Sequence, residues 1–229
     1  MPDLHGFGGQ ILSGAFTTLE VALTSLIFGL VIGLLGATAK LGPIKGMRVL
    51  AGAYTTIIRG IPELLIILIL YFGGTVVLST LYGDYVEVNA FTAGVFSLSI
   101  VFGAYATEVF RAAILAIPRG QIEAAHALGL GPVLTFRLVM FPQMLRYALP
   151  GLGNLWLSLL KDTALISVVG LEDLMRKASV AAGTTHDPLT FYAVAAALYL
   201  SFTSVSLAGL NVLELHANRG VRVLGGERR

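Results

Sequence analysis

The sequence of 229 residues contains no cysteine, a single tryptophan and few charged residues. The lack of cysteine excludes a disulfide framework, a cysteine-built metal site and a thiol nucleophile. Charged residues make up 12% of the chain, about half of the roughly 25% found in soluble domains. Together with 56% hydrophobic residues and a mean hydropathy of +0.84, this scarcity of charge indicates an integral membrane protein.

Several motifs that carry chemistry are also missing. The chain has no G-x-x-x-x-G-K-[ST] phosphate loop, so we do not expect it to bind ATP itself. It has no Ser/His/Asp grouping for acyl chemistry, and no basic stripe interleaved with aromatics that would indicate nucleic acid. The histidines are isolated from one another, which is typical of surface residues and not of a metal site. We therefore expect no enzyme, no metal and no cofactor bound by this chain.

Long apolar runs are what the sequence does contain. A helix needs about 20 apolar residues to cross the hydrocarbon, so we predict an all-α integral membrane protein with five spans. The first ten residues hold no Lys or Arg, so a cleavable signal peptide is not expected. The predicted spans are Ile11–Ala39, Ala51–Leu81 with a proline interruption, Phe91–Ile117, Ala148–Leu171 and Leu189–Leu215.

The distribution of Lys and Arg between the loops predicts the orientation. Ten of them fall in the loops after spans one and three and in the carboxyl-terminal tail, whereas the opposite loops hold only Arg176 and Lys177. Positive charge accumulates on the cytoplasmic side, so the amino terminus is expected outside and the carboxyl terminus inside. The ten residues are Lys40, Lys45, Arg48, Arg119, Arg137, Arg146, Arg219, Arg222, Arg228 and Arg229.

The segment Pro118–Pro142 is neither a span nor a tail, and by this orientation it is cytoplasmic. Apolar and small residues recur at helical spacing after Pro118, which predicts a short amphipathic helix. Gly129 and the pair Gly131-Pro132 should end this helix. A second short segment is then expected to run to a break at Phe141-Pro142. From spacing alone, an ordinary helix lying on the membrane surface is an equal alternative.

This segment contains Glu123-Ala124-Ala125, then Gly129, then the end Val139-Met140-Phe141-Pro142. The pattern resembles the EAA motif of ABC-importer permease subunits, with Val139 and Phe141 in place of the usual Ile and Leu. It implies a coupling helix seated in a groove of a cytoplasmic ATPase subunit. The residues expected to couple to the ATPase are Arg119, Gly120, Glu123, Ala124, Ala125, Gly129 and Pro142.

The preceding residues extend the resemblance to the polar-amino-acid branch of this family. They read Gly-Ala-Tyr at 103–105, Glu-Val-Phe-Arg at 108–111 and Ile-Pro-Arg-Gly-Gln at 117–121. The resemblance is closest to permeases of the histidine/lysine/arginine/ornithine and octopine/nopaline type. It implies a single permease domain over residues 1–229 with the type I importer fold, in the inner membrane of a bacterium. It also implies a second permease subunit, two ATPase subunits that bind ATP and Mg, and a periplasmic substrate-binding protein.

Three carboxylates within the predicted spans are candidates for the substrate path: Glu20, Glu108 and Asp162. Ionisable groups inside a membrane are costly and usually face protein or water. Glu20 also fits a hydrogen-bonded acid near the outer interface. Glu108 lies one helical turn before Arg111 and can pair with it. Asp162, expected near the middle of span four, fits the path and packing between subunits equally well, and its neighbour Lys161 must point elsewhere.

Two further patterns concern the backbone. Gly29, Gly33 and Ala37 recur at four-residue spacing and predict a face for close helix packing, within the subunit or against a partner. Tyr54 to Pro62 resembles the Tyr…Arg-Gly-Thr-Pro pattern of the polar-amino-acid permeases, with Ile61 in place of Thr. We interpret Gly60 and Pro62 as a structural kink in span two.

The predicted function is thus a permease subunit for amino acids, basic ones in particular, which forms the pathway and couples to a separate ATPase. The alternative is a secondary amino acid transporter driven by an ion gradient, which would predict an internal repeat that this sequence lacks. The amino acid carried is left open. A heterodimer is favoured over a homodimer by the resemblance to the Q-type subunits.

Overall fold

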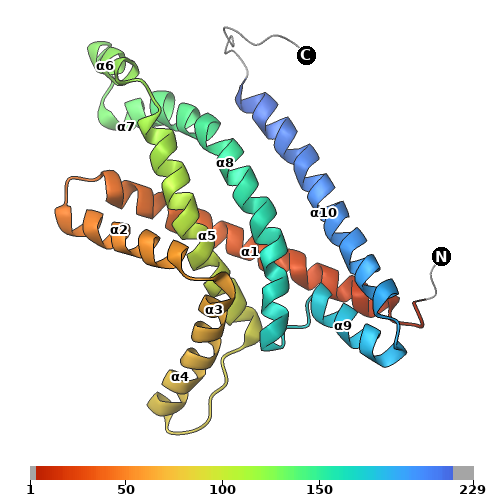
Figure 1. Cartoon of the computed structure of the whole chain (residues 1–229). Coiled ribbons are helices and arrows are strands. Elements are labelled where there is room, and N and C mark those ends of the chain that lie inside the picture. Colours follow the sequence, from red (N-terminus) through yellow and green to blue (C-terminus); the bar gives the residue numbers. More distant parts are fainter. Residues whose placement is uncertain (1–3, 219–229) are drawn as a thin grey trace.

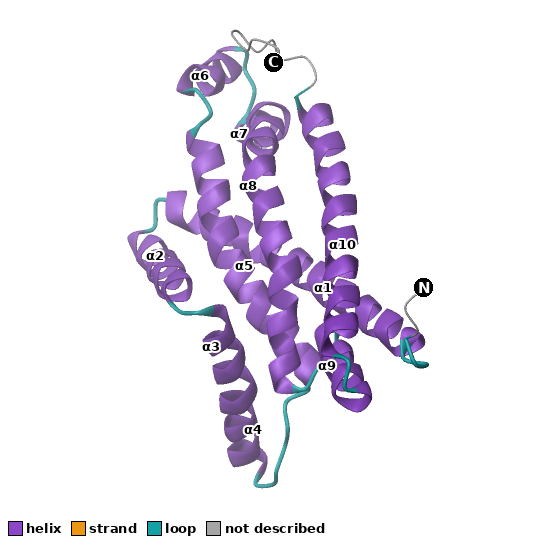
Figure 2. Ribbon diagram, turned by 45° about the vertical axis from the view of Figure 1, so that its right-hand side comes forward, coloured by secondary structure: helices purple, strands orange, loops and turns teal. Residues whose placement is uncertain are grey.

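The computed structural model describes residues 4–218, which form helices joined by short loops (Figure 1). No strand occurs within this range (Figure 2). In chain order the α-helices are α1 (Gly8–Leu41), α2 (Lys45–Gly60), α3 (Glu63–Leu68), α4 (Gly74–Tyr82), α5 (Ala90–Leu115), α6 (Arg119–Ala127), α7 (Pro132–Thr135), α8 (Phe141–Asp162), α9 (Leu174–Thr185) and α10 (Pro188–Ala217). Two π-helical turns, Ile69–Gly73 and Phe136–Met140, continue α3 into α4 and α7 into α8, and a 3₁₀ segment, Thr163–Val169, follows α8.

Five helical segments in the described part of the chain are long and apolar enough to cross a membrane, which confirms the predicted number. They are Gly8–Leu41, Glu63–Tyr82, Ala90–Leu115, Pro132–Val169 and Pro188–Ala217. Helix α5 is the centre of the bundle, since 67% of its most apolar stretch is buried, against 6% for α10. The arginines of the tail used in the orientation argument, Arg219 onwards, lie outside the described residues.

Helices α1 and α5 cross at close range, and glycines make this possible. A Cβ added at Gly29 would come within 2.6 Å of the Phe102 ring, and one at Gly33 within 2.6 Å of the Ala106 side chain. Real Cβ atoms do not approach so closely, so these positions need residues without side chains. The predicted small-residue face therefore packs within the subunit, against α5.

Helix α9 packs against the amino-terminal end of α1. Its buried residues Leu174, Ala178 and Ala181 pack with Ile11 of α1 and Phe191 of α10. Asp173 caps the helix, because its side chain accepts a hydrogen bond from the backbone N–H of Arg176 at 2.9 Å. The loop expected between spans four and five is thus largely a packed helix.

The predicted start of span two at Ala51 is wrong. Helix α2 ends at Gly60, residues Ile61 and Pro62 are extended, and the spanning segment begins at Glu63. Pro62 causes the break because it lacks a backbone N–H and pushes the residue before it out of the helical region. Figures 1 and 2 show α2 turned away from the direction of α3 and α4.

The predicted course of span four needs two corrections. The chain does not break at Pro142, because this proline occupies the first turn of α8, where its missing N–H costs nothing. Helical structure therefore runs without a break from Pro132 to Val169. Asp162 is the last residue of α8 and lies toward the end of this segment, not near its middle.

Candidate functional site

A cavity of about 330 Å³ lies between α5, α8 and the start of α3. This volume is at the lower end of the range for ligand pockets, roughly 300–1,000 Å³. Five of its nine lining residues are apolar, and Ser158, Tyr105 and two carboxylates add polar groups. The lining residues are Glu63, Leu98, Val101, Phe102, Tyr105, Leu155, Ser158, Leu159 and Asp162.

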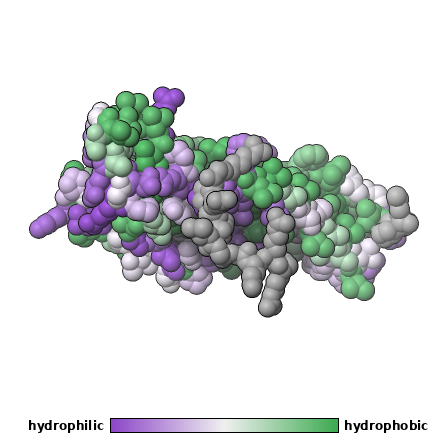
Figure 3. All heavy atoms as spheres, turned by 90° about the horizontal axis from the view of Figure 1, so that it is seen from above, coloured by the Kyte–Doolittle hydropathy of each residue, from purple (hydrophilic) through white to green (hydrophobic). Residues whose placement is uncertain are grey.

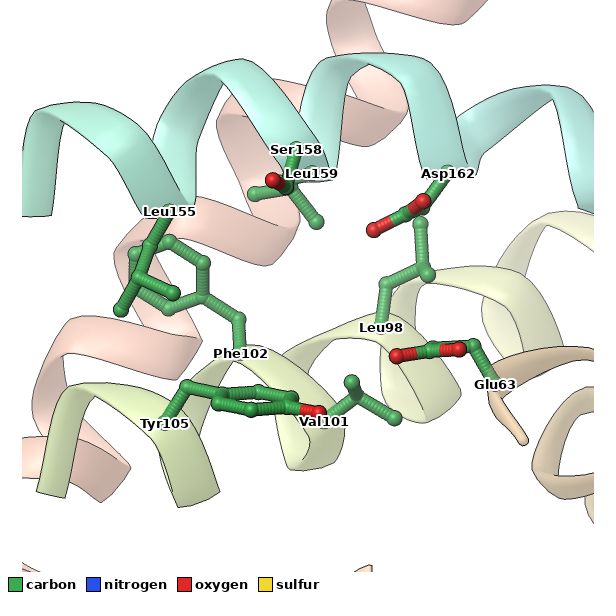
Figure 4. Close-up of a pocket in the computed structure, with 9 residues that line it drawn as sticks. All are labelled: Glu63, Leu98, Val101, Phe102, Tyr105, Leu155, Ser158, Leu159 and Asp162. Atoms are coloured by element: carbon green, nitrogen blue, oxygen red, sulfur yellow. The ribbon is translucent and has the colours of Figure 1, made fainter. Parts of the chain in front are cut away.

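The two carboxylates in this wall are Glu63 and Asp162. Figure 4 shows both side chains facing the interior of the cavity, Glu63 from the first turn of α3 and Asp162 from the last turn of α8. Both residues are half-buried, and neither forms a salt bridge with a residue of the described range. Lys161 is exposed and does not line the cavity, as expected for adjacent positions on a helix. The cavity therefore presents two uncompensated acids.

Glu63 was missed as a site residue in the sequence, where the Gly60–Pro62 break was interpreted only as a kink. A signal was nevertheless present. An ionisable residue directly after a helix break in an apolar run is a functional candidate, because broken backbone at membrane depth is tolerated only where it is buried or lines a cavity.

The other two predicted path residues lie elsewhere. Glu20 is exposed on α1, and neither Glu20 nor Glu108 lines the cavity. The predicted pair of Glu108 with Arg111 is confirmed, with 2.9 Å between the Glu108 Oε2 and Arg111 Nε atoms. The structure brings together Asp162 and Glu63, and not Asp162 with Glu20 or Glu108. A path role for Glu20 and Glu108 stays a prediction.

Glu108 has a second partner that the sequence did not indicate. Lys40, in the last turn of α1, donates a hydrogen bond to the Glu108 Oε1 atom and another to the Thr55 hydroxyl of α2. This side chain is largely buried, with 15% of its surface exposed. A buried ammonium needs such partners because an unpaired charge out of water is costly. Three helices therefore meet at Lys40.

The predicted coupling segment contains the expected short helix, α6, and its end depends on Gly129. This residue has a φ of +77°, a left-handed conformation that favours glycine. The N–H of Gly129 donates to the carbonyl of His126 at 2.9 Å, and the N–H of Leu130 to that of Ala125 at 3.1 Å. This pair of bonds satisfies carbonyls that the helix end would leave unpaired. Gly129 thus terminates α6 as predicted.

The coupling residues differ in exposure. Arg119, Gly120, Glu123, Ala124, Gly129 and Pro142 are exposed. Ala125, also expected to couple to the ATPase, is only 3% exposed and packs inside the segment. An amphipathic helix of this length turns one side inward, and Ala125 lies on that side.

Large apolar side chains are exposed next to α6. Leu128 and Val133 have 81% and 77% of their surface exposed. Figure 3, which looks down on the end of the molecule that carries α6 and α7, shows hydrophobic groups exposed among hydrophilic ones. Leu128 directly follows the last residue of α6, a helix whose exposed residues include Arg119 and Glu123. Exposed apolar side chains surrounded by polar ones are a common feature of protein interfaces.

The pKa of one acid outside the spanning segments is strongly changed by its surroundings. Asp173, the cap of α9, is 1% exposed, and its Oδ2 atom has no hydrogen-bond partner among the described residues. Burial raises the pKa of Asp173 to about 6, although hydrogen bonds from the backbone of Arg176 and Met175 oppose this rise. Its role is to cap α9, and it lies apart from the cavity.

Comparison with known sequences supports a transport role. The profile of the family described as "Binding-protein-dependent transport system inner membrane component" matches residues 29–214. The nopaline transport system permease protein NocQ of Agrobacterium fabrum is 50% identical, over 95% of this chain and 94% of that protein. The histidine/lysine/arginine/ornithine transport system permease protein HisQ of Salmonella typhimurium is 43% identical, over 96% and 98% of the two chains.

Comparison with solved structures supports the same transport role. A chain of an amino acid ABC transporter crystallised with histidines superposes with a TM-score of 0.80 at 34% identity, covering 91% of this chain and 94% of that one. A chain of the MetNI methionine ABC transporter, in an inward-facing form, shares the fold, with a TM-score of 0.71 at 21% identity and coverage of 91% and 96%. The described helices therefore have the type I ABC importer permease fold, and the chain belongs to the permease subunits of binding-protein-dependent amino acid importers.

Proposed function

We propose that this subunit forms part of the pathway for basic amino acids such as arginine, lysine, histidine and ornithine. The observation that carries the proposal is the pair of unpaired carboxylates, Glu63 and Asp162, in a cavity between membrane-spanning helices. A guanidinium or ammonium group entering this cavity would exchange its hydration for charge-assisted hydrogen bonds, which are stronger than neutral ones. The similar NocQ and HisQ permeases are named for nopaline and for histidine, lysine, arginine and ornithine.

The proposal extends to energy coupling. We propose that α6 docks on a separate ATPase subunit through the exposed side of the helix. Arg119, Glu123 and Ala124 would lie at this contact, and Leu128 would lie at its edge. ATP and Mg are then bound by two such ATPase subunits and not by this chain. The exposed apolar side chains support this arrangement, because they would be covered by a partner.

The remaining partners and the location follow from the same proposal. A second permease subunit, in a heterodimer, completes the pathway, and a periplasmic binding protein delivers the amino acid. The chain lies in the inner membrane of a bacterium with its amino terminus outside and its carboxyl terminus in the cytoplasm. Three exposed basic residues support this orientation: Lys45 and Arg119, which begin α2 and α6, and Arg137, near the start of the segment Pro132–Val169.

The test is uptake by the complete transporter in proteoliposomes, with ATP inside. Glu63→Gln and Asp162→Asn are each expected to reduce import of arginine about tenfold or more relative to a neutral amino acid, because each removes one charge-assisted contact. Asp84→Asn is the matched control, since Asp84 is exposed and outside the cavity. An unchanged ratio of arginine to neutral import in both cavity variants would remove the proposed selectivity.

The same vesicles distinguish the alternative, a secondary transporter. Import that requires ATP and survives collapse of the ion gradients supports the ATPase-driven mechanism. Import that stops with the gradient and continues without ATP would overturn it. Affinity capture of the chain from native membranes gives a second measurement, since an ATPase and another permease should be recovered with it.

A further inference from the structure

Helix α2 is attached to α5 at three points along its second half. The Tyr54 hydroxyl donates a hydrogen bond to the carbonyl oxygen of Ile100 at 2.6 Å. The Arg59 guanidinium lies over the ring of Tyr105, 5.2 Å from its centre. Between these two contacts, the Lys40 ammonium joins Thr55 of α2 to Glu108 of α5. We call these three contacts the α2 clamp.

Of the three contacts, the one made by Lys40 should cost the most free energy to remove. The Thr55 hydroxyl is buried, and the Glu108 side chain is 20% exposed. The second oxygen of the Glu108 carboxylate is held by Arg111, so its orientation toward Lys40 is fixed from both sides. Removal of the ammonium would leave this carboxylate with one partner and the Thr55 oxygen with none beyond its own helix. Lys40 therefore links α1, α2 and α5 through polar contacts.

The clamp lies between the cavity and the predicted coupling segment. On α5, Tyr105 lines the cavity and Glu108 follows one helical turn later, toward Pro118, where α6 begins. On α2, Thr55 and Arg59 are four residues apart and share one face of the helix. Directly after α2, across the extended pair Ile61-Pro62, comes the cavity carboxylate of Glu63. These contacts and the short Ile61-Pro62 connection therefore link α5, through α2, to Glu63.

We propose that Lys40 is a positioning residue that makes α2 and the carboxylate of Glu63 follow the movement of α5 when the coupling segment moves. The inference rests on the proposed function, in which α6 receives that movement from an ATPase. Lys40 does not line the cavity, so its effect on transport acts through Glu108 and Thr55. Packing alone gives a weaker link, because α2 exposes most of its large apolar side chains, among them Met47, Leu50 and Ile57.

The experiment measures ATP hydrolysis and amino acid import together in proteoliposomes that hold the complete transporter. Lys40→Met keeps the length of the side chain and removes its charge. The number of ATP molecules hydrolysed per amino acid imported is expected to rise by roughly two- to thirtyfold, the range for mutations within coupled networks. Lys45→Met is the matched control, since Lys45 is exposed at the start of α2 and forms no salt bridge with a described residue. It should leave the ratio unchanged.

A second variant separates coupling from folding. Glu108→Gln should raise the same ratio. Adding Lys40→Met to it should raise the ratio no further, because both substitutions remove the same contact between Lys40 and Glu108. If either single variant lowers hydrolysis and import in equal proportion, the clamp only stabilises the fold and the proposal is overturned. If the wild-type transporter imports without hydrolysing ATP, the proposed function itself fails, which the wild-type vesicles reveal before any variant is made.

Discussion

The carboxylates of Glu63 and Asp162 face the same cavity, although α3 and α8 lie far apart in the chain. No described residue neutralises either of them through a salt bridge. If one cation binds between them, their contributions to transport depend on each other. Removing the first acid weakens the contact that the second can make, since both act on a single positive charge.

A double-mutant cycle on Glu63→Gln and Asp162→Asn tests this dependence. We expect a coupling energy of about 0.5–3 kcal/mol, calculated from the ratio of arginine import to neutral amino acid import. The combination of Glu63→Gln with Asp84→Asn serves as the control and should be additive, because Asp84 is exposed and lies outside the cavity. Additivity in the first cycle would mean that the two acids act on different groups.

At Gly129 the backbone requires a left-handed conformation, and no other atom crowds the position. Gly129→Val should therefore impose a strain of about 1–2 kcal/mol or more and disturb the end of α6, whereas Gly129→Asn should be tolerated much better. The measurement is transport-dependent ATP hydrolysis, normalised to the amount of protein in the membrane.

The control for this pair is Gly131→Ala, at a glycine with a φ of −68° and no close neighbours. It should retain full activity. Equal activity of the valine and asparagine variants would show that the turn at Gly129 does not matter for coupling, and the assignment of this segment would lose its support.

The crossing of α1 and α5 can be tested with one substitution at two positions of the same helix. Gly33→Ala places a methyl group 2.6 Å from the Ala106 side chain and 3.2 Å from its carbonyl carbon. We expect a loss of about 1–3 kcal/mol from this overpacking, seen as a lower melting temperature in detergent. Gly9→Ala has free space and should stabilise α1 slightly, by about 1 kcal/mol at most.

The raised pKa of Asp173 predicts that the stability of the folded protein depends on pH. Burial raises its pKa from 3.8 to about 6, so the folded protein binds this proton more tightly than the unfolded chain. The contribution of Asp173 to the free energy of unfolding is therefore fully present below pH 3.8, where the residue is protonated in both states. This contribution is lost as the pH rises through about 6, by up to roughly 3 kcal/mol. The measurement is the difference in thermal stability between the wild type and Asp173→Asn from pH 4 to 7.

In that comparison, asparagine keeps a side-chain oxygen that can cap α9 and removes the titration. The difference between the two curves should therefore shift in favour of the asparagine variant as the pH rises. A constant difference over this range would mean that Asp173 is ionised in the folded protein throughout.

The sequence by itself determined the features that arise within one helix or one turn. Runs of apolar residues predicted the number of spans, because a helix must satisfy its backbone hydrogen bonds inside the membrane. Pro62 and Gly129 marked a helix break and a helix end through the conformations that their backbones permit. The pairing of Glu108 with Arg111 followed from helical periodicity. The same local reasoning located α6 within the segment that carries the EAA resemblance.

Only the tertiary structure decided which helices meet. That Glu63 and Asp162 share a cavity, that Lys40 reaches Glu108, and that the glycine face of α1 packs on α5 all depend on where helices cross. Apolar residues cover most faces of a helix in a membrane protein, so the pattern along one helix does not indicate its neighbour. Crossing positions result from the complementary shapes of two surfaces, and these surfaces come from residues distant in the chain.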